Sequence, residues 1–218
     1  MPHRFELLVF DWDGTLMDSA AIIVESIQSA SSDVGLPVPS DTDARHIIGL
    51  GLNDALGYLF PGVSRENYGA LVERYRFHFL ARDSEIPLFY GAAEAIRDLR
   101  QKGFLLAVAT GKSRTGLNRA LENTGLRSYF HATRCADEGF SKPHPGMLHA
   151  LMDELGTGPE RTLMIGDTTH DLQMAANAGV AAVGAAYGAH PRDNLLTLSP
   201  LACLESFAEL HRWLMAHA

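Results

Sequence analysis

Short apolar runs recur along the chain, each ending at a glycine, an aspartate or a threonine. Runs of this length, bounded by turn residues, are typical of strands buried in a parallel sheet. We therefore predict four core strands, at Phe5–Phe10, Phe104–Ala109, Thr162–Ile165 and Val180–Ala186. Helical patterns lie between them, at Ala92–Lys102, Thr115–Thr124 and Met147–Leu155. Strands that alternate with helices predict an α/β fold.

The interval between the first two strands is too long for one crossover. A strand–helix–strand unit needs about 30 residues, and the chain uses far more between Asp13 and Thr110. The surplus has helical patterns and no convincing strand, and its helices are predicted at Ala20–Val34, Asp54–Phe60 and Arg65–Ala81. We predict that residues 17–87 form a helical cap domain and that residues 1–16 and 88–218 form the catalytic core. Hinges are expected after Thr15 and around Pro87–Gly91, where proline and glycine interrupt the pattern.

Composition and charge narrow the class of protein. With 218 residues, 46% of them hydrophobic, the chain can form one domain of ordinary size and a second, smaller domain. The net charge of -8 is spread along the chain, which excludes a basic surface for nucleic acid or an anionic membrane. No apolar run reaches the length of about 18 residues that a membrane span needs. We expect a cytoplasmic protein, a monomer rather than a homodimer, with no nucleic-acid or membrane partner.

Cysteine usage adds little to this picture. Cys135 and Cys203 lie far apart and in no metal-binding or redox spacing, so we expect two reduced thiols.

A first cluster of polar residues follows the first strand directly, in the segment DWDGT that starts at Asp11. Asp11 and Asp13 stand at the carboxyl end of a strand, where open α/β sheets bind ligands. Two neighbouring carboxylates permit a nucleophile and a proton-transfer group. Aspartate and glycine are also common in turns, so for this segment alone a simple turn is an equal alternative.

A second cluster, Thr110-Gly111-Lys112-Ser113, again joins a strand to the start of a helix. A hydroxyl and free backbone amides at this position can hold a phosphate group. Taken alone, Thr110 or Ser113 is better explained as a helix N-cap, and Lys112 as a side chain that points into solvent.

A third cluster, SKPHPG, contains Lys142, one of three lysines in the chain. Its prolines would stiffen the loop that carries this lysine. Considered by itself, an ordinary surface lysine is the simpler interpretation.

The fourth cluster, GDTTHD, follows another predicted strand and contains Asp167 and Asp171, which are spaced as neighbours on a first helical turn. A helix cap and an acid near the positive end of a helix dipole would explain them without a function. However, all four clusters fall at the same end of the predicted parallel strands, and they combine carboxylates, hydroxyls and lysine. The combination therefore indicates a shared site.

These four motifs, DWDGTLMDS, TGK, SKPHPG and GDTTHD, resemble those of the haloacid dehalogenase superfamily in their order and in the insertion after the first. The likeness spans nearly the whole chain and favours the phosphoglycolate phosphatase-like branch, whose helical cap lies between the first two motifs. It implies a Rossmann-like core with strand order 5-4-1-2-3, in which Asp11 lies next to Thr110 and Asp167. The chain departs from the family at Gly111, where Asn is frequent, and at Trp12, where an aliphatic residue or Phe is frequent.

The resemblance implies a magnesium-dependent phosphatase that acts on a small phosphorylated metabolite, with phosphoglycolate as the leading candidate. Mg²⁺ prefers oxygen ligands, and we expect them from the side chains of Asp11 and Asp167 and the backbone carbonyl of Asp13. Asp11 would attack phosphorus and form an aspartyl phosphate. Asp13 would protonate the leaving group and then activate water.

Further residues would bind the substrate. A carboxylate that attacks a phosphate ester needs nearby positive charge, which we expect from Mg²⁺ and Lys142. Thr110 and Gly111 would hold the phosphoryl oxygens, and Asp171 would orient Lys142 or a water molecule. In the cap, Arg45 precedes the glycine-bearing segment IGLGLND and is a candidate ligand for a carboxylate or a second phosphate of the substrate.

Several alternatives stay open. A sugar phosphomutase or a pyrophosphatase of the same superfamily would share these motifs, and so would a non-enzymatic ligand-binding module. A haloacid dehalogenase has no need of Asp13, and a phosphonatase needs a cap lysine, whereas Lys102, Lys112 and Lys142 all lie outside the predicted cap.

Two further residue types receive structural interpretations. The ten histidines show no zinc-ligand spacing, so we expect no zinc and regard His144 and His170 as loop residues near the site. Trp12 is expected to pack against the sheet rather than face the ligand.

Overall fold

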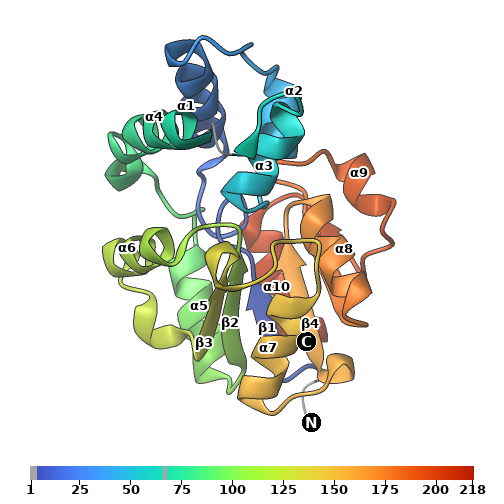
Figure 1. Cartoon of the computed structure of the whole chain (residues 1–218). Coiled ribbons are helices and arrows are strands. Elements are labelled where there is room, and N and C mark those ends of the chain that lie inside the picture. The colour runs from blue at the N-terminus through green and yellow to red at the C-terminus, as the bar shows by residue number, and fades with distance from the viewer. Residues whose placement is uncertain (1–3, 66–67) are drawn as a thin grey trace.

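A computed structural model describes residues 4–65 and 68–218. An α/β core carries a layer of helices at one end of its sheet (Figure 1). The strands are all parallel and lie in the order β3-β2-β1-β4-β5-β6. Their bounds are β1 Leu7–Phe10, β2 Leu105–Thr110, β3 Ala132–Cys135, β4 Thr162–Gly166, β5 Ala181–Ala185 and β6 Cys203–Leu204. The α/β fold and the strand order 5-4-1-2-3 are confirmed, and β6 adds an edge strand next to β5.

The central position of β1 determines where the motifs meet. Phe10 pairs with Val108 of β2 on one side and with Ile165 of β4 on the other. These three strands therefore end at the same level, and the residues that follow them share one edge of the sheet. This is the edge that the helical layer covers in Figure 1.

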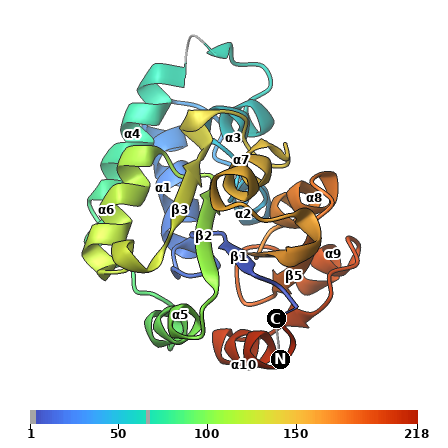
Figure 2. The ribbon, with the colours of Figure 1, turned by 90° about the horizontal axis from the view of Figure 1, so that it is seen from below.

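Alternate residues of the strands face two helical layers. Leu7 and Val9 pack with α7 (Gly146–Leu155) and α8 (Thr169–Asn177). Leu8 and Phe10 belong to a second buried cluster, with side chains from α5 (Ala92–Gln101) and α10 (Phe207–His217). Figure 2 shows the helices around the sheet, including α6 (Arg114–Thr124) and α9 (Arg192–Leu196). The predicted helices at Ala92–Lys102, Thr115–Thr124 and Met147–Leu155 are confirmed within one residue at each end.

In the described part of the chain between β1 and α5, four α-helices lie above the sheet, coloured blue to teal in Figure 1: α1 Ala20–Asp33, α2 Asp41–His46, α3 Leu52–Leu59 and α4 Tyr68–Leu80. The predicted helices Ala20–Val34 and Asp54–Phe60 correspond to α1 and α3. The third, Arg65–Ala81, corresponds to α4, and its positions 66 and 67 lie outside the described residues. Within the described part of the insertion no strand forms, although Met17 makes single bridge pairings with Asp13 and Leu88.

The sequence patterns did not predict the short elements α2, β3 and β6, nor the helices α8, α9 and α10. α2 has the polar sequence DTDARH, which carries no apolar periodicity, and its start depends on the Ser40 side chain, which accepts a hydrogen bond from the Asp43 amide. β3 has only two buried residues out of four, and β6 is only two residues long. Such segments become strands because a neighbouring strand offers its edge.

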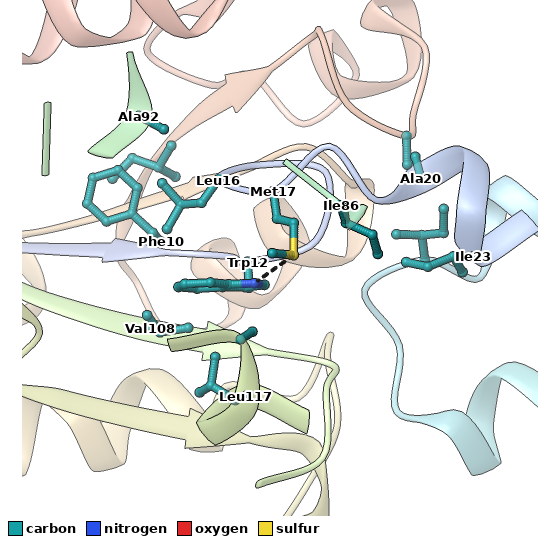
Figure 3. Close-up of a cluster of buried hydrophobic side chains, with 14 of the residues drawn as sticks. Phe10, Trp12, Leu16, Met17, Ala20, Ile23, Ile86, Ala92, Val108 and Leu117 are labelled. Atoms are coloured by element: carbon teal, nitrogen blue, oxygen red, sulfur yellow. Dashed lines mark hydrogen bonds between the residues drawn. The ribbon is translucent and has the colours of Figure 1, made fainter. Parts of the chain in front are cut away.

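Trp12 packs inside the core, as predicted. Its side chain has no solvent exposure, and its Nε1 donates a hydrogen bond to the Met17 sulfur at 3.4 Å (Figure 3). Val108 and Leu117 lie close to it in the same cluster. The indole therefore anchors the first motif to β2 and α6.

Two further findings concern the described residues. Cys135 and Cys203 are both free thiols. No helix in these ranges is both long enough and apolar enough to pass through a bilayer.

Removal of the Trp12 side chain should strongly destabilise the fold. We expect Trp12→Ala to lower the free energy of unfolding by about 3–5 kcal/mol, because it leaves a large cavity in a closed core. Urea unfolding followed by circular dichroism measures this loss. Trp213→Ala is the matched control, since Trp213 on α10 is only partly buried, and it should lose less than half as much. Equal losses would contradict the anchoring role of Trp12.

Candidate active site

The four motifs meet at the carboxyl edge of the sheet. Asp11 follows β1, Thr110 ends β2, and Asp167 follows β4. Lys142 enters from the loop between β3 and α7, and Asp171 from the first turn of α8. All five side chains are buried, with at most 2% exposure. The structure thus brings together residues that are far apart in the sequence.

Lys142 lies between two carboxylates. Its Nζ is 2.6 Å from Asp11 Oδ1 and 2.6 Å from Asp171 Oδ1. Burial alone would lower the pKa of Lys142, but the charges of Asp11 and Asp171 outweigh burial and raise that pKa. Lys142 is therefore a fixed positive charge, and the interpretation as an ordinary surface lysine is wrong.

Asp171 is held in place by its own helix start. Its Oδ2 accepts hydrogen bonds from the Thr168 hydroxyl at 2.7 Å and from the Thr168 amide at 3.1 Å. The alternative interpretation of Asp171 as part of a helix cap is therefore correct, but it does not account for the contact with Lys142. Its second oxygen contacts Lys142, so one side chain both caps α8 and orients the lysine.

The carboxylates of Asp11, Asp167 and Asp171 carry more negative charge than Lys142 alone can balance. Burial raises the pKa of Asp11 well above its ordinary value, and the charges of Asp171 and Asp167 add to burial while Lys142 opposes it. Burial, with a further contribution from Asp171, raises the pKa of Asp167 to about 7. The three carboxylates would be ionised together only with additional positive charge nearby.

The same residues fit a divalent cation. One carboxylate oxygen from each of Asp11, Asp167 and Asp171 lies within 4.8 Å of the others. Oδ2 of Asp11 is buried and has no hydrogen-bond partner among the described residues. A buried acceptor without a partner is unfavourable, and a hard cation with oxygen ligands would satisfy it. The donor set therefore suits an ion such as Mg²⁺.

Two glycines allow the backbone to close around Asp167. A Cβ atom on Gly14 would lie 2.1 Å from Asp167 Oδ2, and one on Gly188 would lie 2.3 Å from Asp167 Cβ. The carboxylate itself accepts hydrogen bonds from Thr15 Oγ1 at 2.8 Å and from the Ala189 amide at 2.7 Å. Asp167 is consequently fixed from several sides.

Asp13 has partners that the sequence analysis missed. Its Oδ1 accepts hydrogen bonds from Lys112 Nζ at 3.0 Å and from Ser19 Oγ at 2.7 Å. The expectation that Lys112 points into solvent is therefore wrong, because its side chain is only 9% exposed. Its Nζ also lies 4.7 Å from the ring centre of Phe79 on α4. The position of Lys112 directly after Thr110 and Gly111 was the available signal.

In the second motif, Ser113 and Thr110 have different roles. Ser113 is the N-cap of α6, and its hydroxyl accepts a hydrogen bond from the Gly116 amide. Thr110 is fully buried, and its Oγ1 accepts a hydrogen bond from the Lys112 amide at 3.1 Å. The N-cap interpretation therefore holds for Ser113 only.

Gly111 explains how the cap approaches the core. A Cβ atom at this position would lie 2.5 Å from the carbonyl oxygen of Gly49 and 2.6 Å from that of Leu50. A second contact lies nearby, where the Gly51 amide donates a hydrogen bond to Ser141 Oγ at 3.2 Å. The glycine that departs from the family pattern thus lets the loop after α2 lie directly on the second motif.

A cavity of about 750 Å³ lies between the cap and the core. Asp11, Asp13, Thr110 and Gly111 contribute to its wall. Its cap side is mainly apolar, with Ile23, Ile27, Val72, Tyr75 and Phe79. Arg45 is not among the described residues that line it; Arg65, Arg76 and Arg119 are. A site of this form can hold a phosphate group at its floor and a larger group beneath the cap.

Comparison with known proteins agrees with this geometry. The haloacid dehalogenase-like hydrolase family matches residues 8–185, so the chain belongs to that family. The probable phosphatase IndB of Dickeya dadantii is 37% identical over 94% of this chain and 91% of its own. Phosphoglycolate phosphatase of Agrobacterium fabrum is 31% identical over 94% of this chain and 90% of its own.

A solved structure extends the likeness to the whole architecture. A predicted phosphatase from Clostridium acetobutylicum superposes with a TM-score of 0.85 at 25% identity, over 97% of this chain and 99% of its own. The chain is therefore a phosphatase of the haloacid dehalogenase-like family, in the phosphoglycolate phosphatase-like branch that its motifs indicated.

A side chain at position 111 should prevent the cap from closing. We expect Gly111→Ala to lower kcat/KM by about 10- to 100-fold, because displacing a binding group by roughly 1 Å has effects of this size. Steady-state phosphate release measures it. Gly69→Ala on α4, where an added Cβ meets open space, is the control and should retain activity. Wild-type activity in Gly111→Ala would contradict the close approach of the cap.

The raised carboxyl pKa values predict an unusual pH dependence without metal. A folded state with Asp167 near pKa 7 binds more protons than the unfolded chain between about pH 4 and pH 7. In the presence of a chelator, this contribution to the free energy of unfolding should therefore fall as the pH rises from 5 to 8. Added Mg²⁺ should reverse most of the fall.

Urea unfolding at both pH values, with chelator and with Mg²⁺, tests this expectation. Asp167→Asn removes the titrating group, so its stability in chelator should vary less with pH than that of the wild type. An identical pH dependence in the two proteins would show that Asp167 is not perturbed as the structure indicates.

Proposed function

We propose that the protein is a magnesium-dependent phosphatase that hydrolyses a small phosphorylated metabolite through an aspartyl phosphate on Asp11. The observation that carries this proposal is the state of the Asp11 carboxylate. One of its oxygens contacts Lys142, and the other is buried with no hydrogen-bond partner among the described residues. Asp11 also lines the cavity, so its carboxylate can contact a phosphate ester bound there.

The metal would be held by side-chain oxygens of Asp11 and Asp167 and by the backbone carbonyl of Asp13. Bound there, Mg²⁺ would supply positive charge that offsets the charge of the phosphoryl group. Lys142 supplies further positive charge from the protein, and Asp171 positions it.

The two acids of the first motif would divide the chemistry. Asp11 attacks phosphorus, which splits the hydrolysis into two displacements. Asp13 gives a proton to the leaving oxygen and later takes one from the water that cleaves the acyl phosphate. Lys112 and Ser19 hold its Oδ1 and orient it towards the cavity, whose wall it shares with Asp11. Thr110 and the amide of Gly111 hold the phosphoryl oxygens.

The cavity supports a substrate with a second anionic group, as phosphoglycolate has. Arg119 pairs with Asp83, and Arg65 pairs with Asp54. Arg76 on α4 lines the cavity and has no ion pair among the described residues. Arg45, expected for this role, lies outside the cavity wall, so we propose Arg76 in its place. The phosphoglycolate phosphatase of Agrobacterium fabrum, a relative over most of its length, favours the same substrate class.

We retain the proposed division into a core of residues 1–16 and 88–218 and a cap of residues 17–87. The bridge pairings of Met17 with Asp13 and Leu88 support this division. They join the two segments through which the chain passes from the core to the cap and back. We also propose that the protein is cytoplasmic and monomeric.

Replacement of the nucleophile should abolish turnover. We expect Asp11→Asn to reduce kcat by at least about 10³-fold with the fold intact, because the substitution removes the carboxylate that forms the covalent intermediate. The measurement is phosphate release from phosphoglycolate, sugar phosphates, nucleoside monophosphates and pyrophosphate, with Mg²⁺ and with chelator. Asp18→Asn, an exposed aspartate of the same segment, is the control and should behave as wild type.

The panel also separates the alternatives. Release that needs Mg²⁺ and disappears in Asp11→Asn supports the proposal, and the best compound identifies the substrate. Preference for pyrophosphate would indicate a pyrophosphatase. If the folded wild type releases no phosphate from any compound of the panel, the proposal is contradicted and a mutase or a binding protein is favoured.

A further inference from the structure

Three histidines from distant parts of the sequence meet beside the active site. His46 ends α2 in the cap, His170 lies in the first turn of α8, and His190 follows β5. His170 is thus helical rather than part of a loop. The ring centres are 5.2 Å apart for His46 and His170, 5.4 Å for His46 and His190, and 5.3 Å for His170 and His190. The three rings therefore form a nearly equilateral triangle.

This triangle has the size of a three-histidine metal site. In a tetrahedral zinc site, each nitrogen lies about 2.1 Å from the ion, which places ring centres about 3.2 Å from the ion and about 5.2 Å from one another. One ring nitrogen from each of the three histidines lies within 4.8 Å of the others. Small movements of the rings would bring them to ligand distance.

Two of the ring nitrogens share one hydrogen-bond acceptor. Nε2 of His170 donates a hydrogen bond to the carbonyl oxygen of His46 at 2.7 Å, and Nε2 of His190 donates one to the same oxygen at 3.1 Å. These two nitrogens therefore lie on the same side of the cluster, and an ion bound there would replace their hydrogens.

The surroundings suit neutral imidazole ligands. Burial lowers the pKa of His170, and it lowers the pKa of His190 to about 4. Nδ1 of His190 accepts a hydrogen bond from the Thr169 amide at 3.0 Å and lies 3.2 Å from the Thr169 hydroxyl. If Nε2 binds an ion, Nδ1 carries the hydrogen, so the ring must turn away from the amide and donate to the Thr169 hydroxyl instead. His46 and His170 are only partly buried, which leaves a path for an ion from solvent.

We propose that His46, His170 and His190 form a second metal site, which binds one transition-metal ion such as Zn²⁺ and joins the cap to the core. The nitrogen ligands distinguish it from the carboxylate cluster, since imidazole suits Zn²⁺ and Co²⁺ whereas Mg²⁺ prefers oxygen. Because one ligand belongs to the cap and two belong to the core, a bound ion holds the cap against the sheet edge. Sequence spacing alone hides this site, since only the fold brings positions 46, 170 and 190 together.

Co²⁺ binding to the whole chain, with Mg²⁺ at saturation, tests the proposal without any measurement of turnover. We expect one Co²⁺ per chain with the intense visible absorption of a tetrahedral nitrogen site, displaced by one equivalent of Zn²⁺. His46→Asn and His170→Asn should each bind Co²⁺ at least about tenfold more weakly. Circular dichroism establishes which variants are folded, and either folded variant is sufficient.

Two controls separate this site from others. His149→Asn removes an exposed histidine of α7 and should bind as wild type. Asp167→Asn, which impairs the proposed magnesium site, should retain the Co²⁺ absorption, so failure of the proposed function leaves this result unchanged. Absence of stoichiometric binding in the wild type overturns the proposal and leaves the three rings as a packing cluster. Equal binding by wild type and both histidine variants overturns it as well.

Discussion

The ion pair of Lys142 with Asp11 and Asp171 is the interaction on which the site depends. A fully buried lysine is strongly unfavourable unless carboxylates surround it, and here it lies 2.6 Å from two of them. The pair links the loop after β3 to the end of β1 and the start of α8. Since Asp171 also caps α8, the same charges that would activate a phosphate ester also fix three separate segments of the core.

Excess negative charge follows from this arrangement. Asp11, Asp167 and Asp171 share one lysine, and the raised pKa values of Asp11 and Asp167 express the lack of further positive charge. A divalent cation, together with Lys142, would balance the charge of this cluster. The close packing of Gly14 and Gly188 against Asp167 keeps its carboxylate directed at this point. A cation that binds this cluster would therefore stabilise the folded state.

Much of the core could be predicted from the sequence, because buried parallel strands are continuous apolar runs and the motifs stand at their ends. Asp11, Thr110, Lys142 and Asp167 were placed at one sheet edge by that argument. Contacts across the cap were not predictable. The contact of Lys112 with Phe79, the approach of Gly49 to Gly111 and the cluster of three histidines all depend on how α2 and α4 lie over the sheet. No local pattern encodes that placement.

Chemical trapping of the intermediate tests the central claim most directly. Acid quenching during turnover, reduction of acyl phosphates with borohydride and mass spectrometry of the peptides would locate the phosphorylated side chain. The account predicts reduction at position 11 alone, and only when substrate is present. Reduction at Asp13 or Asp167, or none during active turnover, would contradict the assignment of Asp11 as the nucleophile.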